Sequence, residues 1–395
     1  MNLFESRYFN LNRLLMSLIG LWPYQKLESR RIKMIFISFF MAIGVIAQLL
    51  SFVTIEYSRD LLTKVFSFSF IILICTIKYN MLYFKSEQVK YLFEQILYDW
   101  HAFTDAEEMK IIQKYANKGR SLTIYTGLVI YIGILVFIVL FFIPDILDIV
   151  TPLNEPRRHQ LPVTIETLFD QEKHFLFIVL NFFIITFVML TVLWTIETLY
   201  MMCIQHACGL LKLTSYRILN AFDNRLQQIS IPNKKLKCTI CIKLSKAIKI
   251  HRRSIEFIEC LCSTFSVSYF ILCVFIVASL SINLFEFLKA VESKHTSQAI
   301  HIGMFVYAHL VYIFWINYFG QALIDNSADV FTQTYNVKWY MVSTHIQKKI
   351  LFILHRSAKD IMFDVGNIFT FSLDGVALLI NKSLSYSMLL YSTRA

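Results

Sequence analysis

The chain has 395 residues, of which 56% are hydrophobic, 15% aromatic and only 16% charged. Soluble domains carry about 25% charged residues, so this composition excludes an ordinary water-soluble protein. The formal net charge of +11 does not indicate nucleic-acid binding, because the basic residues flank apolar segments and no nucleic-acid-reading motif accompanies them.

Seven apolar segments are long enough to cross a bilayer, whose hydrocarbon core of about 30 Å needs about 20 residues of helix. Backbone groups inside lipid must pair within their own segment, which favours helices over open sheet. The segments cover residues 34–55, 61–84, 122–143, 175–204, 260–288, 299–323 and 366–391. No internal repeat divides residues 1–395. The sequence therefore predicts the all-α fold class: one polytopic membrane domain with seven transmembrane helices.

The distribution of Lys and Arg predicts the orientation of the chain, because cytoplasmic flanks carry the excess of these residues. After the fourth segment, residues 205–259 hold eleven basic and three acidic residues, which places this loop in the cytoplasm. After the third segment, residues 144–174 hold six acidic and three basic residues, which places that loop outside. Seven crossings then give a cytoplasmic N-terminus and an extracellular C-terminus. The first 33 residues show no cleavable signal.

Two cytoplasmic stretches, about 217–259 and 327–361, carry apolar residues at helical spacing among lysines and other polar residues. This pattern predicts helices that extend out of the membrane and form a cytoplasmic anchor. The part from Ile346 to Ile361 is amphipathic. It fits either a surface helix at the bilayer interface or a contact between subunits.

The last segment has one polar face. At about 100° per residue, six of its side chains fall within an arc narrower than a right angle. They are Asp374, Leu378, Asn381, Ser385, Leu389 and Ser392. Polar side chains within a span normally face a cavity or another helix. The face therefore fits either a helix that hydrogen-bonds within its own bundle, or a water-lined wall in which Leu389 forms a hydrophobic constriction and Ser392 lies at the outer mouth.

The outer halves of the second, third, fourth and sixth segments are rich in aromatic residues. The candidates for ligand contact are Phe66, Phe70, Phe137, Phe141, Phe182, Phe305 and Tyr307. Aromatic, mostly apolar clefts between helices suit small volatile or lipophilic ligands. The same residues also fit plain packing or contact with lipid.

No constellation of residues supports an enzyme. The sequence lacks H-E-x-x-H, G-x-S-x-G, Walker and dinucleotide-binding motifs, so we expect neither catalysis nor a cofactor. Cys238 and Cys241 form a lone C-x-x-C without two further ligands at suitable spacing, so we expect no metal site. His309, in the interior of the sixth segment, fits a satisfied interior polar residue.

Two groups of residues in the C-terminal part carry a resemblance to a known family. The first is the stretch from Gly320 to Ser327 with Leu323, followed by Tyr335 and Trp339. The second consists of Arg356, Ser357, Gly366, Phe369, the Ser372-Leu373-Asp374 triplet and Ser385-Tyr386-Ser387. With these residues the chain resembles the insect odorant receptors, in the ligand-tuned group, from its first span to its end. Ser387 departs from the aromatic residue that usually follows the Ser-Tyr pair in that family.

The resemblance implies an odorant-gated, non-selective cation channel in the plasma membrane of olfactory sensory neurons. It implies a heterotetramer with the universal olfactory co-receptor, surrounded by membrane lipid and opened by a volatile odorant. The last span would line the pore, with Leu389 as the gate and Ser392 beside it. The cytoplasmic anchor would make most subunit contacts.

Two other assignments remain open. A gustatory receptor channel of the same superfamily shares the architecture but ends in a Thr-Tyr motif with a downstream Phe, which Ser385-Tyr386 lacks. A G-protein-coupled receptor also has seven spans, but it would show a D-R-Y-like triplet, an N-P-x-x-Y motif and an N-terminus outside.

Overall fold

A computed structural model describes residues 3–54, 58–143, 175–222, 234–366 and 368–393. The acidic loop predicted to lie outside, residues 144–174, falls beyond the described residues. Residues 223–233 of the predicted cytoplasmic helices and the side chain of Cys238 do so as well.

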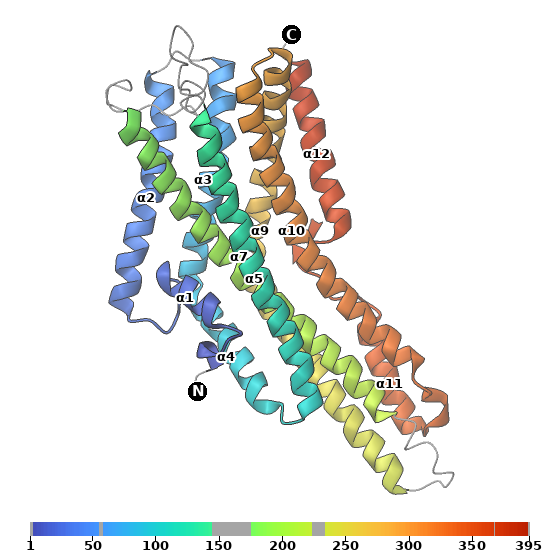
Figure 1. Cartoon of the computed structure of the whole chain (residues 1–395). Coiled ribbons are helices and arrows are strands. Elements are labelled where there is room, and N and C mark those ends of the chain that lie inside the picture. The colour runs from blue at the N-terminus through green and yellow to red at the C-terminus, as the bar shows by residue number, and fades with distance from the viewer. Residues whose placement is uncertain (1–2, 55–57, 144–174, 223–233, 367, 394–395) are drawn as a thin grey trace.

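The described chain is almost entirely helical, and the predicted all-α class is confirmed (Figure 1). Its α-helices are α1 (Asn10–Leu18), α2 (Leu27–Thr54), α3 (Arg59–Phe84), α4 (Ser86–Ala102), α5 (Ala106–Phe141), α7 (Phe175–Ala221), α9 (Lys234–Glu292), α10 (Thr296–Asn336), α11 (Thr344–Ser357) and α12 (Leu373–Ser392). Short 3-10 turns are η1 (Leu3–Glu5) and η2 (Trp339–Met341). Strands β1 (Asp364–Val365) and β2 (Phe369–Thr370) form a two-stranded antiparallel hairpin.

Six described helices are long and apolar enough to cross a membrane: α2, α3, α5, α7, α9 and α10. They cover the first six predicted spans, apart from residue 55, which is not described, and residues 142–143, which follow the end of α5. Three of them are much longer than a bilayer requires, with 47 residues in α7, 59 in α9 and 41 in α10. At about 1.5 Å per residue, α9 is roughly 90 Å long. The lower ends of these helices project below the other helices, and α11 packs there against α9 and α10 (Figure 1).

The last predicted span begins later than expected. We expect a helix from Gly366, but residues 364–370 form the β1–β2 hairpin and α12 starts at Leu373. Gly366 has a φ of +61° at the turn of the hairpin, a conformation that favours glycine. Ser372 then caps the helix, since its side chain accepts a hydrogen bond from the Gly375 backbone N–H at 3.1 Å. Helix α12, which carries Asp374, Asn381, Lys382 and four serines, is not among the six described helices that are long and apolar enough to cross a membrane.

Helix α12 lies along α9 and α10 at the same level as the upper parts of the other long helices (Figure 1). Its start is held against α10. The Ser372 backbone N–H donates to Asn317 Oδ1 at 3.1 Å, and the Leu373 N–H donates to Gln321 Oε1 at 3.1 Å. A Cβ atom at Gly320 would lie 2.1 Å from the Phe371 carbonyl oxygen, so only glycine permits this close approach.

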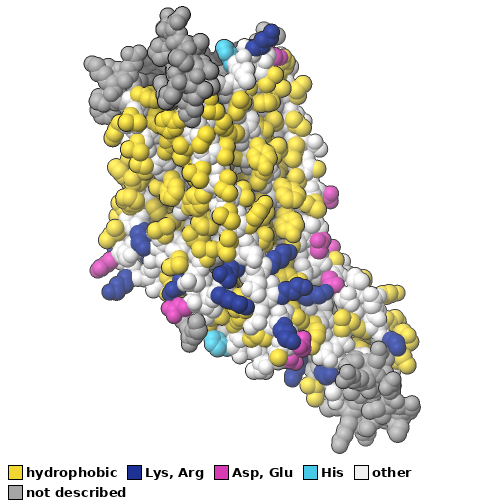
Figure 2. Space-filling model, in the orientation of Figure 1, with side chains coloured by type: hydrophobic (Ala, Val, Ile, Leu, Met, Phe, Trp, Pro, Cys, Tyr) yellow, Lys and Arg dark blue, Asp and Glu magenta, His cyan; other side chains and the backbone are white. Residues whose placement is uncertain are grey.

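The surface divides into two zones. Hydrophobic side chains cover the upper part of the face in Figure 2, and Lys and Arg gather below them. Large apolar side chains are widely exposed on the long helices, for example Ile32 at 68% and Leu176 at 74%. An apolar surface of this extent requires lipid or another protein chain to cover it.

Candidate functional site

Helix α12 has two faces with opposite environments. Gly375, Leu379, Ser383 and Ser387, spaced four residues apart, are buried in the bundle. The six residues of the predicted polar face are all exposed, with Leu378 at 46% and Leu389 at 57% exposure. The polar face therefore points away from its own chain, and it does not hydrogen-bond into the bundle as one of the two interpretations required.

The exposed face combines polar groups with one apolar interruption. The Ser385 hydroxyl donates to the Asn381 carbonyl at 2.9 Å, and the Ser392 hydroxyl donates to the Leu389 carbonyl at 2.9 Å. These bonds satisfy the hydroxyls within the helix, whereas the Asn381 amide and the Asp374 carboxyl are exposed. Such groups are costly next to hydrocarbon, so the face calls for water or a second chain.

Three of the predicted aromatic residues meet in the upper part of the bundle, together with Phe68. The ring centroids of Phe137 and Phe182 are 6.3 Å apart, and those of Phe137 and Phe305 are 5.8 Å apart. Phe68 contacts Phe182 at 5.6 Å and Phe305 at 6.0 Å. We call these four rings the outer aromatic cluster; they come from α5, α7, α10 and α3. Phe141 joins it through Phe183, at 5.7 Å.

The other predicted aromatic residues lie elsewhere. Phe66 and Phe70 stack on each other at 5.3 Å, and Phe70 also contacts Phe275 of α9. Tyr307 is 69% exposed. Sequence reasoning missed Phe68, which lies two residues from both Phe66 and Phe70 and so points to the opposite side of α3. Phenylalanine alternates with serine over residues 66–70, and composition alone does not reveal which of these phenylalanines face the interior of the bundle.

A buried charge cluster lies deeper in the bundle, and sequence reasoning missed it as well. The Lys78 ammonium of α3 pairs with Glu197 Oε1 of α7. Glu197 also accepts hydrogen bonds from the Tyr312 hydroxyl of α10 and the Tyr269 hydroxyl of α9, each at 2.7 Å. Lys78 Nζ lies 3.1 Å from the Tyr312 oxygen and 3.8 Å from the centre of the Tyr269 ring.

The charge cluster joins four membrane-crossing helices. Lys78 and Glu197 are only 2% and 6% exposed, and Tyr269 is fully buried. Buried charges are tolerated when paired and hydrogen-bonded, as both are here. A signal in the sequence could have revealed them. Glu197 is the one acidic or basic residue within residues 175–204, and Lys78 is one of two within residues 61–84. Charged residues within an apolar span are functional candidates by default.

His309 behaves as expected. It is buried, its Nε2 lies 2.9 Å from the Ser279 hydroxyl and its Nδ1 lies 2.7 Å from the Phe305 carbonyl oxygen. Both ring nitrogens therefore have partners, and the side chain fits a satisfied interior polar residue.

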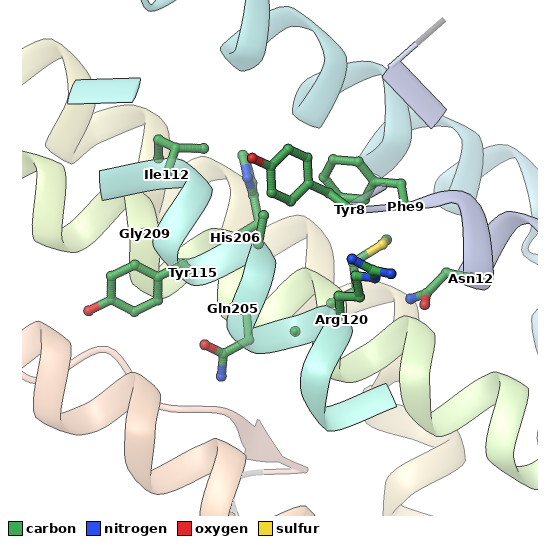
Figure 3. Close-up of a pocket in the computed structure, with 12 residues that line it drawn as sticks. Tyr8, Phe9, Asn12, Ile112, Tyr115, Arg120, Gln205, His206 and Gly209 are labelled. Atoms are coloured by element: carbon green, nitrogen blue, oxygen red, sulfur yellow. The ribbon is translucent and has the colours of Figure 1, made fainter. Parts of the chain in front are cut away.

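Figure 3 shows a small cavity between α1, α5 and α7, lined by Tyr8, Asn12, Tyr115 and Arg120 among others. Its volume of about 10 Å³ is far too small for an odorant-sized molecule and matches about one water. Gln205 lines it, and neither of its buried amide atoms has a partner among the described residues. An open groove of about 380 Å³ lies between α9 and α11, lined by side chains that include His251 and Phe352.

Comparison with known proteins finds similarity to odorant receptors. The family model described as 7tm Odorant receptor matches residues 59–383. Odorant receptor Or2 of Anopheles gambiae is 25% identical over 152 residues, and Odorant receptor 10 of Aedes albopictus is 26% identical over 149 residues. Each match covers 38% of this chain and 39% of the mosquito protein, so the chain matches less than half the length of these relatives.

Two solved structures share the fold. The insect olfactory receptor OR5 of Machilis hrabei in complex with eugenol matches with a TM-score of 0.76 at 14% sequence identity, over 98% of this chain and all of that one. A second structure of the same receptor matches with a TM-score of 0.68 at 14% identity, over 98% of this chain and 99% of that one. At this identity the comparison establishes the fold alone.

The charge cluster yields a prediction about stability. Glu197→Ala leaves the Lys78 ammonium buried without a counter-charge, which should lower the free energy of unfolding by about 3–5 kcal/mol. Replacing both residues with methionine removes the unpaired charge and should restore most of the loss. The measurement is the thermal transition of detergent-solubilised protein. As a control, Arg252→Ala breaks an exposed pair with Glu256 and should leave the transition unchanged. A transition temperature equal to that of the wild type in Glu197→Ala would contradict the prediction.

Proposed function

Because the chain belongs to the 7tm Odorant receptor family, we propose that it is a subunit of an odorant-gated, non-selective cation channel that works with the universal olfactory co-receptor. The observation that carries this proposal is the exposed polar face of α12. A helix that buries Gly375, Leu379, Ser383 and Ser387 and exposes a polar stripe is suited to stand between a bundle and water.

The pore proposal follows from the cost of polar groups in lipid. Asp374 and Asn381 would be expensive against hydrocarbon, but several copies of α12 around a common axis would enclose water along the polar stripe. Leu389 interrupts that stripe near the C-terminal end of the helix. A ring of leucines there would form a hydrophobic constriction that gates by dewetting, with Ser385 below it and Ser392 above it.

The proposed orientation puts the N-terminus in the cytoplasm, α12 as the seventh crossing and the C-terminus outside. Lys and Arg collect below the apolar zone, at the end where α7, α9, α10 and α11 project (Figures 1 and 2). This distribution is the one that cytoplasmic flanks show. The family suggests the plasma membrane of olfactory sensory neurons as the location.

The projecting helices are proposed as the cytoplasmic anchor that contacts neighbouring subunits. On α11, Ile346, Ile350 and Ile353 are buried, whereas Leu351 and Phe352 on the other side are 65% and 74% exposed. Exposed apolar side chains next to a membrane-crossing bundle favour contact with a second subunit in a heterotetramer over an isolated surface helix.

The proposed ligand is a small, volatile and largely apolar molecule. The outer aromatic cluster provides rings from four helices in the upper part of the bundle, and Phe141 extends it. A Machilis receptor with the same fold has been solved in complex with eugenol. Phe66, Phe70 and Tyr307 lie outside the cluster, and we do not place the ligand against them.

The first test is electrical. Cells that express the chain together with the co-receptor should show cation current within a fraction of a second of odorant delivery, without added nucleotide or second messenger. A panel of volatiles supplies the ligand, and cells with either subunit alone serve as controls. Strict dependence on a G protein would instead support a G-protein-coupled receptor and overturn the channel proposal.

The gate has its own prediction. Leu389→Ala widens the proposed constriction and should raise the ligand-free current about threefold or more, or change ion permeability. Leu384→Ala is the matched control, because Leu384 is also exposed but lies about 100° from the centre of the polar stripe. Whole-cell recordings normalised to surface protein measure both. Wild-type behaviour of Leu389→Ala in both respects would remove this residue from the pore.

The ligand site can be tested with two substitutions of similar size. Phe137→Ala removes a ring from the outer aromatic cluster and should raise the half-maximal odorant concentration about 10- to 100-fold. Tyr307→Ala changes a residue that is 69% exposed. The half-maximal odorant concentration of this variant should change by less than about threefold, because the Tyr307 side chain lies outside the outer aromatic cluster. Dose–response curves check both, and equal shifts would place the ligand elsewhere.

A further inference from the structure

Tyr269 of α9 connects the charge cluster to the segment that precedes α12. Its hydroxyl donates to Glu197 Oε2 at 2.7 Å, and the Lys78 ammonium lies over its ring at 3.8 Å. The same ring packs edge-on against Phe363 at 5.8 Å and Phe371 at 5.4 Å. One fully buried side chain therefore contacts both features at once.

The two phenylalanines belong to the segment that sets the start of α12. Phe363 precedes β1 and Phe371 follows β2, and the Phe371 backbone N–H donates to the Phe363 carbonyl at 3.2 Å. Both are fully buried and their rings lie 5.5 Å apart. Phe371 is also pressed against Gly320, where it leaves no room for a Cβ atom. This segment cannot shift without displacing the Tyr269 ring, because interiors are close-packed.

Helix α12 continues directly from this segment. Ser372, the capping residue, follows Phe371, and α10 holds the first turn through Asn317 and Gln321. The base of α12 is thus fixed from two sides: by amide side chains of α10 and, through Phe371, by Tyr269. A change in the position of the Tyr269 ring therefore reaches the start of α12 through Phe371 and Ser372.

The charge cluster also shares helices with the outer aromatic cluster. Helix α3 carries Phe68 and Lys78, α7 carries Phe182 and Glu197, and α10 carries Phe305 and Tyr312. Displacement of these helices in the outer aromatic cluster would therefore alter the separation of the charged groups. Because a buried ion pair is sensitive to its geometry, the cluster can convert such a displacement into a change at Tyr269.

We propose that Lys78, Glu197 and Tyr269 are positioning residues for α12, which set the resting placement of its base through the contact of Tyr269 with Phe371. The inference rests on the proposed channel function and deepens it, because it names the contact through which the bundle acts on the pore helix. A buried ion pair is weak evidence for stability, since apolar residues of similar volume often pack as well. A positioning role gives the pair a function that apolar packing lacks.

The test is Tyr269→Phe in the full chain, expressed with the co-receptor. This substitution keeps the ring and its packing but removes the hydrogen bond to Glu197. Because a resting channel conducts little, loosening the base of α12 should raise the ratio of ligand-free to maximal odorant current about threefold or more. The ratio is independent of how many channels reach the surface, so a merely structural effect, which scales both currents, does not move it.

Tyr79→Phe is the matched control. Tyr79 is also fully buried, and its hydroxyl donates to the Ile19 carbonyl at 2.8 Å, a bond that involves neither the charge cluster nor α12. It should scale both currents equally. Phe371→Leu tests the contact from the other side and should raise the same ratio. It carries the prediction alone if Tyr269→Phe does not reach the surface.

The outcomes separate the two proposals. A raised ratio in Tyr269→Phe and Phe371→Leu, with a combined effect smaller than the product of the single effects, supports the shared contact. An unchanged or lower ratio in a channel whose wild type responds to odorant overturns the positioning role and leaves the channel function standing. No odorant current from the wild type with the co-receptor overturns the channel function, and the positioning role with it.

Discussion

The ion pair between Lys78 and Glu197 is the interaction around which the membrane-crossing helices are arranged. A carboxylate and an ammonium this deeply buried need each other, and the remaining hydrogen-bonding capacity of Glu197 is met by the hydroxyls of Tyr269 and Tyr312. Each of the four side chains comes from a different helix. The cluster therefore specifies how α3, α7, α9 and α10 meet, which apolar packing in lipid specifies less sharply.

Helix α12 depends on that arrangement because its own buried face makes only limited apolar contact with the bundle. Its buried face is made of small residues and one leucine, which allow close approach to α9 and α10 but provide little apolar area. Its position is set at its base, where Gly320 admits Phe371 and the amides of Asn317 and Gln321 receive the first backbone N–H groups. The outward face is thereby left exposed on the surface of the chain.

Relatives of this chain keep the fold at low identity for a physical reason. The structural match to the Machilis receptor extends over 98% of the chain at 14% identity. Lipid-facing positions require only apolar character, so most of them can change freely without altering the packing. In this chain, the packing requirements that go beyond apolar character are local: the close approach at Gly320, the capping Ser372 and the buried contacts of Glu197.

The sequence by itself determined the all-α membrane class, the approximate bounds of six long helices and the polar stripe on the last one. These follow from the length of apolar runs and from helical periodicity, which depend only on the order of neighbouring residues along the chain. Only the tertiary structure decided that the stripe points outward, that α12 begins at Leu373 after a hairpin, and that Phe68 rather than Phe66 faces Phe182. Partners separated by more than a hundred residues, such as Lys78 and Glu197, leave no periodic signal, because their pairing depends on how whole helices pack.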